Sequence, residues 1–474
     1  MAYNNTLPKK SENVSDWYNA IVVQAELAEY GPAKGTMIFR PYGYAIWEAI
    51  QKELDARIKD KGVDNVYFPM FIPESLLNKE AEHIEGFAPE LAVVTIGGGE
   101  ELNERLIVRP TSETIICSSF SKWVTSWRDL PMCVNQWANV VRWEKRTYMF
   151  LRTTEFLWQE GHTIHASHAE ATEMQEWAMG MYKQIFREHM ALPGIVGRKS
   201  ESEKFAGADM TLTYEILMPD GKALQSCTSH DLGQNFAKSF DIAYSSKEGT
   251  REFVWQTSWG LSTRVIGGLV LGHGDDQGLR LPPKMAPVQV VIIPVRAEDD
   301  ILAYCEKLAA ELKVLGVRAK VDARDESIGF RINKWEMKGV PVRLEIGRKE
   351  IEAGTVTVGR RDTGVKESLP ADGISETLVK LLDEIQAGML AESEKFLADN
   401  THSVETYDEF KAIMAGPRGF IKAMWCEDAD CEAAIKNETK ATTRCLESGT
   451  PKEEGTCVRC GKPASYRWHF AQSY

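Results

Sequence analysis

The order of strand-like and helical segments between residues 105 and 290 is the feature that most constrains the fold of this chain. Short runs typical of strands recur there, and only two helical segments, near residues 112–127 and 169–190, interrupt them. The runs cover residues 106–108, 140–143, 156–162, 210–217 and 265–271. Regular βαβ units would need a helix between successive strands, so this order predicts one large antiparallel sheet of an α+β domain.

A helix and an interrupted strand precede this region. Apolar residues recur at helical spacing over residues 42–61, namely Tyr44, Ile46, Trp47, Ile50, Leu54 and Ile58. Gly62 follows, and residues 66–72 have the composition of a strand that Pro69 breaks. We therefore expect a long helix that stops at Gly62 and is followed by an irregular strand.

The pattern changes after the proline-rich residues 281–287, which mark a domain boundary. Strand-like and helical segments then alternate, which predicts a small α/β domain of about 100 residues. Strands are expected at 288–294, 317–321, 342–346 and 355–358, and helices at 299–314, 331–338 and 374–396. Residues 318–361 contain eleven Lys or Arg and seven Asp or Glu, an excess of basic residues that is usually just a solvated face.

Composition and charge exclude several classes of protein. The 474 residues are 43% hydrophobic and 26% charged, which is typical of a folded chain and excludes a disordered or fibrous one. The net charge of −13 argues against general binding of polyanions, so any contact with nucleic acid would depend on local patches. No apolar run approaches the roughly 20 residues that span a bilayer, and no signal peptide is recognisable. We expect a cytoplasmic, multi-domain enzyme.

Four of the nine cysteines form two close pairs late in the sequence. Cys426 and Cys431 are separated by four residues, and Cys457 and Cys460 by two. Four thiolates in two pairs match the tetrahedral coordination of structural zinc, and the alternative is a set of free buried thiols. Cys445 lies between the pairs. The odd number and uneven placement of the cysteines favour a reducing compartment over a disulfide framework.

A second group of informative residues accompanies one predicted strand. Arg142 and Glu144 are two residues apart, so on a strand their side chains would face the same side. A guanidinium and a carboxylate on one face suit a ligand that carries both a phosphate and an amine, and Arg152 would add a second guanidinium. An isolated Arg-x-Glu is more often a surface ion pair. Here, however, Phe156 and the segment Gly260-Leu-Ser-Thr-Arg264 accompany it.

These segments resemble the sequence motifs of the class II aminoacyl-tRNA synthetases. Arg-x-Glu, a loop and Arg-x-x-x-Phe over residues 142–156 resemble motif 2, residues 260–264 resemble motif 3, and residues 42–69 resemble the dimer-forming motif 1. Further segments resemble the prolyl-tRNA synthetases of the type found in archaea, eukaryotes and some bacteria, and this likeness covers residues 15–474. They are Arg109-Pro-Thr-Ser-Glu113, Phe156-Leu-Trp-Gln-Glu-Gly-His162, Lys204-Phe-Ala-Gly207, Thr228-Ser-His230 and Leu281-Pro-Pro-Lys284.

The resemblance implies a domain organisation and a reaction. Residues 1–286 would form the antiparallel-sheet catalytic domain, 287–400 an α/β anticodon-binding domain and 401–474 a small zinc-binding domain. The family activates L-proline with ATP to prolyl-adenylate and pyrophosphate, and then transfers prolyl to the 3′ end of tRNA(Pro) with release of AMP. The resemblance also implies a homodimer and Mg²⁺. It assigns the structural zinc to Cys426, Cys431, Cys457 and Cys460.

The family's residue roles carry over as follows. ATP would be held by Arg142, Glu144, Arg152, Thr153, Phe156, Gln225, Thr228, Ser262 and Arg264, with Arg142 and Arg264 as the catalytic residues. Proline would be bound by Thr111, Glu113, Arg142, Trp158, Glu160, His162, Phe205 and His230. In-line attack of a carboxylate on the α-phosphate brings two negatively charged reactants together. Fixed guanidinium groups lower that barrier without a protein nucleophile.

Two alternatives and several lesser expectations accompany this interpretation. The alternatives are a class II synthetase of another specificity, such as threonine, and a non-catalytic tRNA-binding paralogue. Trp335, Lys338, Arg343 and Glu345 could contact anticodon bases, and the terminal Tyr474 is implied to dock near the active site. The interval between motifs 2 and 3 is too short for the editing insertion of typical bacterial prolyl enzymes. We therefore expect incomplete exclusion of alanine.

Overall fold

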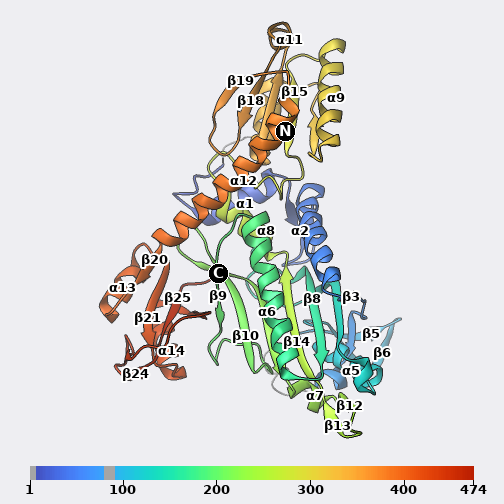
Figure 1. Ribbon diagram of the computed structural model, residues 1–474, viewed down its shortest axis with the longest axis vertical. Helices are drawn as coiled ribbons and strands as arrows, with labels where there is room; N and C mark the ends of the chain where they lie inside the picture. The colour runs from blue at the N-terminus through green and yellow to red at the C-terminus, as the bar shows by residue number, and fades with distance from the viewer. Residues whose placement is uncertain (1–6, 80–90) are drawn as a thin grey trace.

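The computed structural model describes residues 7–79 and 91–474, which form three connected parts (Figure 1). A large sheet with its helices forms the middle of the molecule, a smaller α/β domain lies at one end, and a strand-rich C-terminal module lies beside the sheet. The long helix α12 (Ile374–Asp399) runs from the α/β domain to this module. Among the described residues, no helix combines the length and apolar character needed to cross a membrane.

The central sheet has eleven strands and confirms the large antiparallel sheet predicted from the sequence. The strand predicted at residues 106–108 does not belong to it, because it forms the end of β6 (Glu100–Val108) in a separate three-stranded sheet. Its two parallel pairs lie at the edges, β3 beside β7 and β20 beside β21. In order across the sheet, the strands are β20 (Thr401–Ser403), β21 (Phe420–Trp425), β25 (Tyr466–Ala471), β22 (Thr442–Glu447), β9 (Ile195–Arg198), β10 (Met210–Leu217), β11 (Ala223–Gly233), β14 (Trp255–Ser262), β8 (Glu155–His165), β7 (Met132–Val141) and β3 (Asp64–Asn65). Because β22 pairs with β9, the strands of the C-terminal module continue the central sheet.

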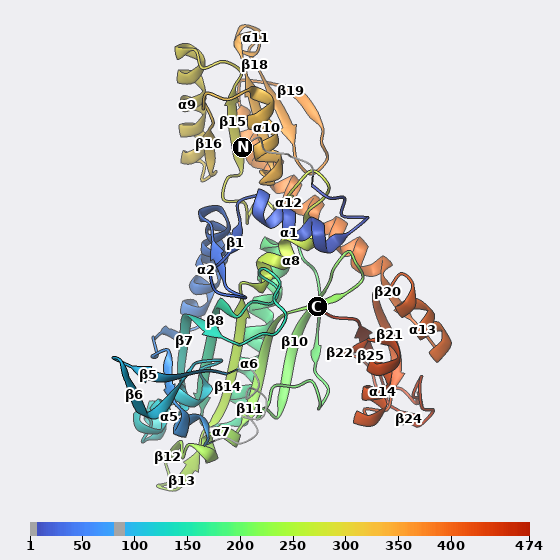
Figure 2. The same ribbon diagram turned by 180° about the vertical axis from the view of Figure 1, so that it is seen from behind.

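Helix α6 (His168–Gln184) covers one face of the central strands (Figure 1). Gln159 of β8 faces this helix and accepts a hydrogen bond from Tyr182 (2.6 Å), and Trp259 of β14 packs edge-on against Trp177. Side chains alternate along a strand, so the even-numbered residues of β8 and β14 face the other side of the sheet. Figure 2 shows the ribbon from that side. That opposite side carries the candidate active site.

The N-terminal part confirms the predicted helix and only part of the predicted strand. Helix α2 (Pro41–Asp60) matches the prediction for residues 42–61, and Gly62 follows it with a left-handed φ of +85°. Between β3 and β4 (Phe71–Pro73) the chain forms no ladder, and Pro69 in this segment has no N–H to donate to one. The other elements are α1 (Val14–Gln24), β1 (Ala28–Tyr30), β2 (Met37–Phe39), α3 (Glu74–Leu77), β5 (Ala92–Gly97), β6 (Glu100–Val108) and α5 (Glu113–Trp123).

Residues 265–271 form a helix, so the strand predicted there is wrong. Helix α8 (Arg264–His273) is buried along the whole of residues 265–271. A helix enclosed on all sides has no polar face, and its sequence is a continuous apolar run that periodicity cannot distinguish from a buried strand. The glycines permit this enclosure, because a Cβ at Gly267 would lie 2.6 Å from Leu151 Cδ2 and 2.8 Å from the Tyr18 hydroxyl.

The α/β domain follows its predicted order of elements. Strand β15 (Val290–Pro294) is parallel to both β16 (Ala319–Val321) and β17 (Val342–Ile346), and β18 (Thr355–Arg360) and β19 (Lys366–Pro370) extend the sheet antiparallel. The helices are α9 (Asp299–Val314), α10 (Ile328–Met337) and α11 (Arg348–Ala353). Helix α11 and strand β19 were not predicted, because both are short and mostly polar and therefore lack an apolar period.

The C-terminal module has its own aromatic core. The Trp425 ring packs edge-on against Trp468 and Phe470, at centroid distances of 5.0 and 6.1 Å. Its remaining elements are α13 (Tyr407–Ala415), α14 (Ala429–Thr439), β23 (Gly455–Thr456) and β24 (Pro463–Ala464). Elsewhere the chain forms a 3₁₀ turn (Trp127–Asp129), a π turn (Ile185–His189), α7 (Asn235–Ser239), β12 (Ala243–Ser245) and β13 (Arg251–Phe253).

Candidate active site and four-cysteine site

A pocket of about 280 Å³ opens on the face of the sheet opposite α6. It collects all eight residues predicted for proline and six of the nine predicted for ATP. These residues are Thr111, Glu113, Arg142, Phe156, Trp158, Glu160, His162, Phe205, Gln225, Thr228, His230, Ser262 and Arg264. Most of them are alternate residues of β8, β11 and β14, so the pleat of adjacent strands aims them into one space.

The other three predicted ATP residues, Glu144, Arg152 and Thr153, do not line this pocket. Arg152 lines a neighbouring cavity of about 330 Å³, and its Nε donates to Glu144 Oε2 (2.7 Å). Gln225 and Arg264 line both cavities. A ligand that extends from the pocket past Arg264 would therefore reach Arg152.

Arg142 and Glu144 lie beyond the strand that the sequence analysis assigned to them. The ladder between β7 and β8 ends where Val141 pairs with Glu155, so no partner strand remains for residues 142–144. The chain turns there, and the Glu144 backbone N–H donates to the Arg142 carbonyl (2.7 Å). The strand expected at Arg142 and Glu144 is therefore wrong, because β7 ends at Val141. Arg142 is aimed instead by its Nε, which donates to the Pro110 carbonyl (3.1 Å).

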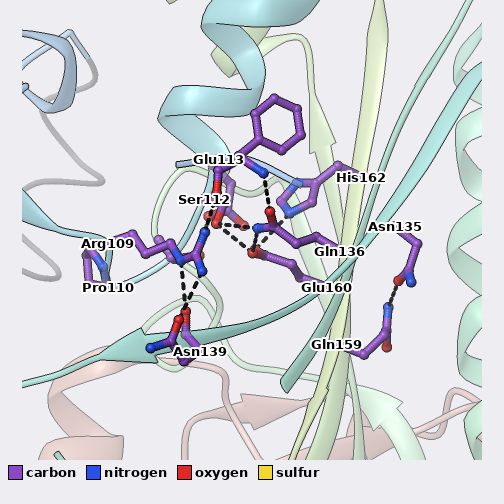
Figure 3. Close-up of polar contacts among 12 residues, drawn as sticks. Arg109, Pro110, Ser112, Glu113, Asn135, Gln136, Asn139, Gln159, Glu160 and His162 are labelled. Carbon is purple, nitrogen blue, oxygen red and sulfur yellow. Dashed lines mark hydrogen bonds and ion pairs between the residues drawn. The ribbon is translucent and has the colours of Figure 1, made fainter. Parts of the chain in front are cut away.

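Glu160 is held in the pocket by three polar side chains (Figure 3). Ser112 Oγ donates to Glu160 Oε1 (2.5 Å), Gln136 Nε2 donates to the same oxygen (2.8 Å), and His162 Nε2 is hydrogen-bonded to Oε2 (3.0 Å). Glu113 is also buried and accepts a hydrogen bond from the Thr111 hydroxyl. Two carboxylates therefore border one enclosed space, an arrangement that suits a cationic ligand.

The two histidines of the pocket have opposite pKa shifts. Burial by itself lowers the pKa of His162, but the hydrogen bond to Glu160 and the charges of Glu160 and Glu113 raise it overall above 6.5. At His230 burial dominates and lowers the pKa to about 4. His230 is therefore neutral near neutral pH, and its Nδ1 is hydrogen-bonded to Thr211 Oγ1 (2.9 Å).

Aromatic rings form the apolar part of the pocket. The Phe205 ring lies 4.5 Å from the His230 ring, centroid to centroid, and the Phe205 backbone N–H donates to Thr211 Oγ1 (3.0 Å). The guanidinium of Arg142 lies 5.5 Å from the Phe156 ring and 5.9 Å from the Trp158 ring. Flat rings around a small space suit a compact apolar group on the ligand.

Arg264 provides a partly buried positive charge that the two cavities share. Its Nε donates to the Leu151 carbonyl (3.0 Å) and its Nη1 to the Gln225 carbonyl (3.4 Å). Burial, together with the positive charges of Arg142 and Arg152, lowers its pKa to about 10, so it stays charged near neutral pH. Three guanidinium groups in one region favour polyphosphate binding.

Three residues that shape the pocket received no role from the sequence, although Arg109 begins one of the segments that carry the resemblance. Arg109 is completely buried and donates to the Phe68 carbonyl (2.6 Å), which anchors the segment before Thr111 (Figure 3). Lys199 and Glu203 line the pocket directly. The only available signal was that all three lie in or beside segments already marked by the resemblance. Their burial depends on packing that the sequence does not show.

The paired cysteines converge at one point of the C-terminal module. The four Sγ atoms lie within 4.8 Å of one another, with 3.5 Å between Cys426 and Cys460 and 3.6 Å between Cys431 and Cys457. Burial tends to raise the pKa of the Cys457 thiol, but neighbouring backbone N–H groups lower it to about 7, which favours a thiolate. Cys445 is buried elsewhere in the core. These four sulfurs fit tetrahedral Zn²⁺.

The structure corrects part of the expectation for anticodon contacts. Trp335 is buried, and its Nε1–H donates to a carboxylate within the α/β domain (2.7 Å). Lys338 is also buried and forms an ion pair with Glu26 of the N-terminal part. Both side chains are enclosed by packing and cannot stack on bases in this arrangement. Arg343 and Glu345 bind each other at 3.0 Å.

The C-terminal end of the chain reaches the catalytic core (Figure 1). The Tyr474 hydroxyl donates to Asp220 Oδ1 (2.7 Å), and its ring lies 4.9 Å from Lys222 Nζ. Tyr474 also lines the cavity that contains Arg152. Its position is consistent with docking near the active site, while its role there stays a prediction.

Comparison with known protein families assigns each part of the chain to a class. The family described as tRNA synthetase class II core domain (G, H, P, S and T) matches residues 94–272, and the anticodon binding domain matches residues 289–381. The family described as Prolyl-tRNA synthetase, C-terminal, matches residues 407–474. The antiparallel sheet with its arginine-lined pocket is thus the core of a class II aminoacyl-tRNA synthetase.

Individual relatives, which are similar over almost the whole chain, show which family within this class the chain belongs to. Proline--tRNA ligase 2 of Clostridioides difficile (strain 630) is 50% identical over 470 residues, which cover 99% of this chain and 98% of that protein. Proline--tRNA ligase of Rubrobacter xylanophilus is 52% identical over 472 residues, which cover 99% of this chain and 98% of that protein. Proline--tRNA ligase of Chlorobium chlorochromatii is 50% identical over 479 residues, which cover 99% of each protein. The chain belongs to the proline--tRNA ligase family, which confirms the resemblance found in the sequence.

Proposed function

We propose that this chain joins L-proline to tRNA(Pro). It activates proline with ATP to prolyl-adenylate and pyrophosphate, and then transfers the prolyl group to the 3′ end of the tRNA with release of AMP. The observation that supports this most is the pocket, which combines the carboxylates of Glu113 and Glu160 with the guanidinium groups of Arg142 and Arg264. An amino acid needs the first pair of groups for its ammonium, and a nucleotide needs the second for its phosphates.

Proline binds at the carboxylate-lined part of the pocket. Thr111 and Glu113 receive its secondary ammonium, and Arg142 lies beside its carboxylate. Trp158 and Phe205 contribute aromatic surface for the pyrrolidine ring. Glu160, His162 and His230 complete the polar frame around that ring.

The nucleotide extends from Arg264 towards Arg152, across the two adjoining cavities. The proline carboxylate attacks the α-phosphate in line, a carboxylate oxygen–phosphorus bond forms, and the bond to pyrophosphate breaks. Arg142 and Arg264 stabilise the charge that develops on the phosphate, and no side chain becomes covalently attached. The nucleotide is also contacted by Phe156, Gln225, Thr228 and Ser262. Glu144, which binds Arg152, and Thr153, which follows it, complete this part of the site. Mg²⁺ would neutralise phosphate charge when bound.

Several partners complete the proposal. The α/β domain binds the proline anticodon of the tRNA, and the four cysteines hold a structural zinc. The chain acts as a cytoplasmic homodimer. Exposed aromatic side chains around the motif 1 segment, Tyr44, Tyr67 and Phe71, support the dimer because isolated soluble subunits rarely expose such a group of large apolar residues.

ATP–pyrophosphate exchange, dependent on the amino acid and run without tRNA, tests this function. We expect the strongest exchange with proline, and a loss of about 100-fold or more in Arg264→Gln, because this substitution removes a charge aimed at the transition state. Arg251→Gln is the matched control, since Arg251 is exposed and pairs with Asp241 away from the pocket. Exchange strongest with threonine would favour another class II specificity. No exchange with any amino acid, from folded protein, would favour a non-catalytic tRNA-binding paralogue.

A further inference from the structure

One wall of the pocket is fastened to the C-terminal module. Residues 199–209 connect β9 to β10, and Lys199, Glu203 and Phe205 of this segment line the pocket. Ser200 and Ser202 of the same segment are instead hydrogen-bonded to Glu432, in the first turn of α14. The contact therefore joins the catalytic core to the module that carries the four cysteines.

Glu432 is buried and accepts hydrogen bonds from three hydroxyl groups. Ser200 Oγ donates to its Oε1 (3.0 Å), Ser202 Oγ donates to its Oε2, and Thr443 of β22 donates to Oε1. A buried carboxylate needs several donors in place of its lost hydration, so these groups hold one another in a defined geometry. Two of the three donors belong to residues 199–209, and Glu432 therefore restrains that segment at two points.

A short series of contacts connects these serines to the ligand-facing side. The Lys204 backbone N–H donates to the Ser200 carbonyl (3.0 Å), which forms a tight turn directly before Phe205. The Phe205 backbone N–H and His230 Nδ1 both bind Thr211 Oγ1, and the Phe205 ring packs on His230. A shift of Ser200 would therefore displace the Phe205 wall relative to His230.

The other side of Glu432 is tied to the cysteines. Cys431 directly precedes it in the same helical turn. Asp428 caps this turn by accepting from the Cys431 backbone N–H (3.0 Å), and the Asp428 carboxylate also binds Lys462 (2.8 Å), which follows the second cysteine pair. The geometry of the four-cysteine site therefore sets the place of the first turn of α14, and with it that of Glu432.

We propose that Glu432 is a positioning residue for the proline pocket, through which the four-cysteine module holds residues 199–209 and the Phe205 wall in place. The inference rests on the proposed function, because Phe205 is a wall for proline only if the chain activates proline. Glu432 touches no substrate. Its loss should weaken proline binding most, because the Phe205 wall depends on residues 199–209, and should affect ATP binding much less, because only Glu203 of that segment also lines the cavity that contains Arg152.

Kinetics of ATP–pyrophosphate exchange test this on both sides of the contact. We expect Glu432→Gln and Ser202→Ala to raise the KM for proline about ten-fold, with kcat and the KM for ATP within about two-fold of wild type. Glu438→Gln is the matched control, because Glu438 lies in the same helix and binds Tyr407 and Arg459 within the module. An unchanged KM for proline, or a parallel rise of both KM values, would overturn the proposal.

Hydrogen–deuterium exchange provides a readout that does not depend on activity. Backbone amides of residues 199–209 should exchange faster in Glu432→Gln, and also after zinc is removed with a chelator, while amides of β8 stay protected. Unchanged protection of residues 199–209 would overturn the coupling, whichever amino acid the enzyme activates. A loosened segment in an enzyme that activates another amino acid would contradict the proposed function and support the coupling.

Discussion

Arg444 of the C-terminal module forms a buried ion pair with Glu215 of the catalytic sheet, with its Nε 3.0 Å and its Nη2 2.8 Å from Glu215 Oε2. Lys199 Nζ lies 3.1 Å from the other carboxylate oxygen. Burial alone would raise the pKa of Glu215, but the charges of Arg444 and Lys199 lower it to about 2. Arg444 lies in β22 and Glu215 in β10, and Lys199 directly follows β9. The junction therefore contains a charge cluster that neither part could satisfy alone.

Removal of one partner of this cluster should destabilise the whole chain. Arg444→Met leaves the Glu215 carboxylate buried with one cation fewer, and we expect it to lower the free energy of unfolding by about 3–5 kcal/mol. Arg251→Met is the control, since Arg251 pairs with Asp241 at the exposed surface, where water screens the pair, and the free energy of unfolding should stay nearly unchanged. Urea unfolding compares the two variants. Equal losses of the free energy of unfolding in both variants would show that the buried Arg444–Glu215 pair contributes no more than an exposed ion pair.

We expect the Glu160–His162 pair to contribute to the free energy of unfolding by an amount that depends on pH. Although burial opposes it, the hydrogen bond to Glu160 keeps the pKa of His162 in the folded state above its ordinary 6.5. The folded state therefore binds the proton more tightly than the unfolded state. The stabilisation is complete below about pH 6.5 and is lost as the pH rises through the folded pKa.

The free energy of unfolding of His162→Gln, compared with wild type, measures this term. The difference between the two proteins should shrink as the pH rises above about 6.5, because only the wild type loses the proton that the pair holds. Urea unfolding at several pH values gives the difference directly. A difference that is constant or grows with pH would show that His162 is not protonated in the folded state.

Metal analysis should distinguish zinc ligands from the remaining cysteines. Cys457→Ser removes one of four converging sulfurs, so we expect purified protein with little or no zinc and a lower unfolding temperature. Cys445→Ala changes a buried cysteine outside the cluster and should keep one zinc per chain. Loss of zinc from both variants, or from neither, would contradict the assignment of the ligands.

Alanine should be activated at a measurable rate. Alanine is smaller than proline and therefore fits the pocket. Each methylene group that alanine lacks lowers its binding relative to proline by only about 1–3 kcal/mol. ATP–pyrophosphate exchange that depends on alanine should therefore be weak but detectable, and exchange that depends on glycine should be weaker still. We also expect this chain to leave alanyl-tRNA intact. Rapid deacylation of alanyl-tRNA by the purified protein would contradict this prediction.

The sequence was informative where chemistry depends on neighbouring residues and on spacing along one element. The resemblance led to the residues that line the pocket, including Glu160 and His162. The pleat explains why these two share a face, because side chains two residues apart on a strand point to the same side. The same reasoning failed at Arg142 and Glu144, because a strand ends where its partner ends, and the partner's first residue is not visible in the local pattern. It also failed at α8, whose enclosure removes the polar face that identifies a helix.

The sequence by itself determined the order of elements, the two cysteine pairs and the residues available to bind a nucleotide and an amino acid. These properties depend on local backbone preference and on side-chain chemistry, which the residues carry with them. Only the tertiary structure decided that Glu432 binds Ser200 and Ser202, that Arg444 neutralises Glu215, and that Trp335 is buried. Such contacts join residues that are far apart in the sequence, and they form only when packing removes both partners from water, so that each becomes the other's hydrogen-bond partner.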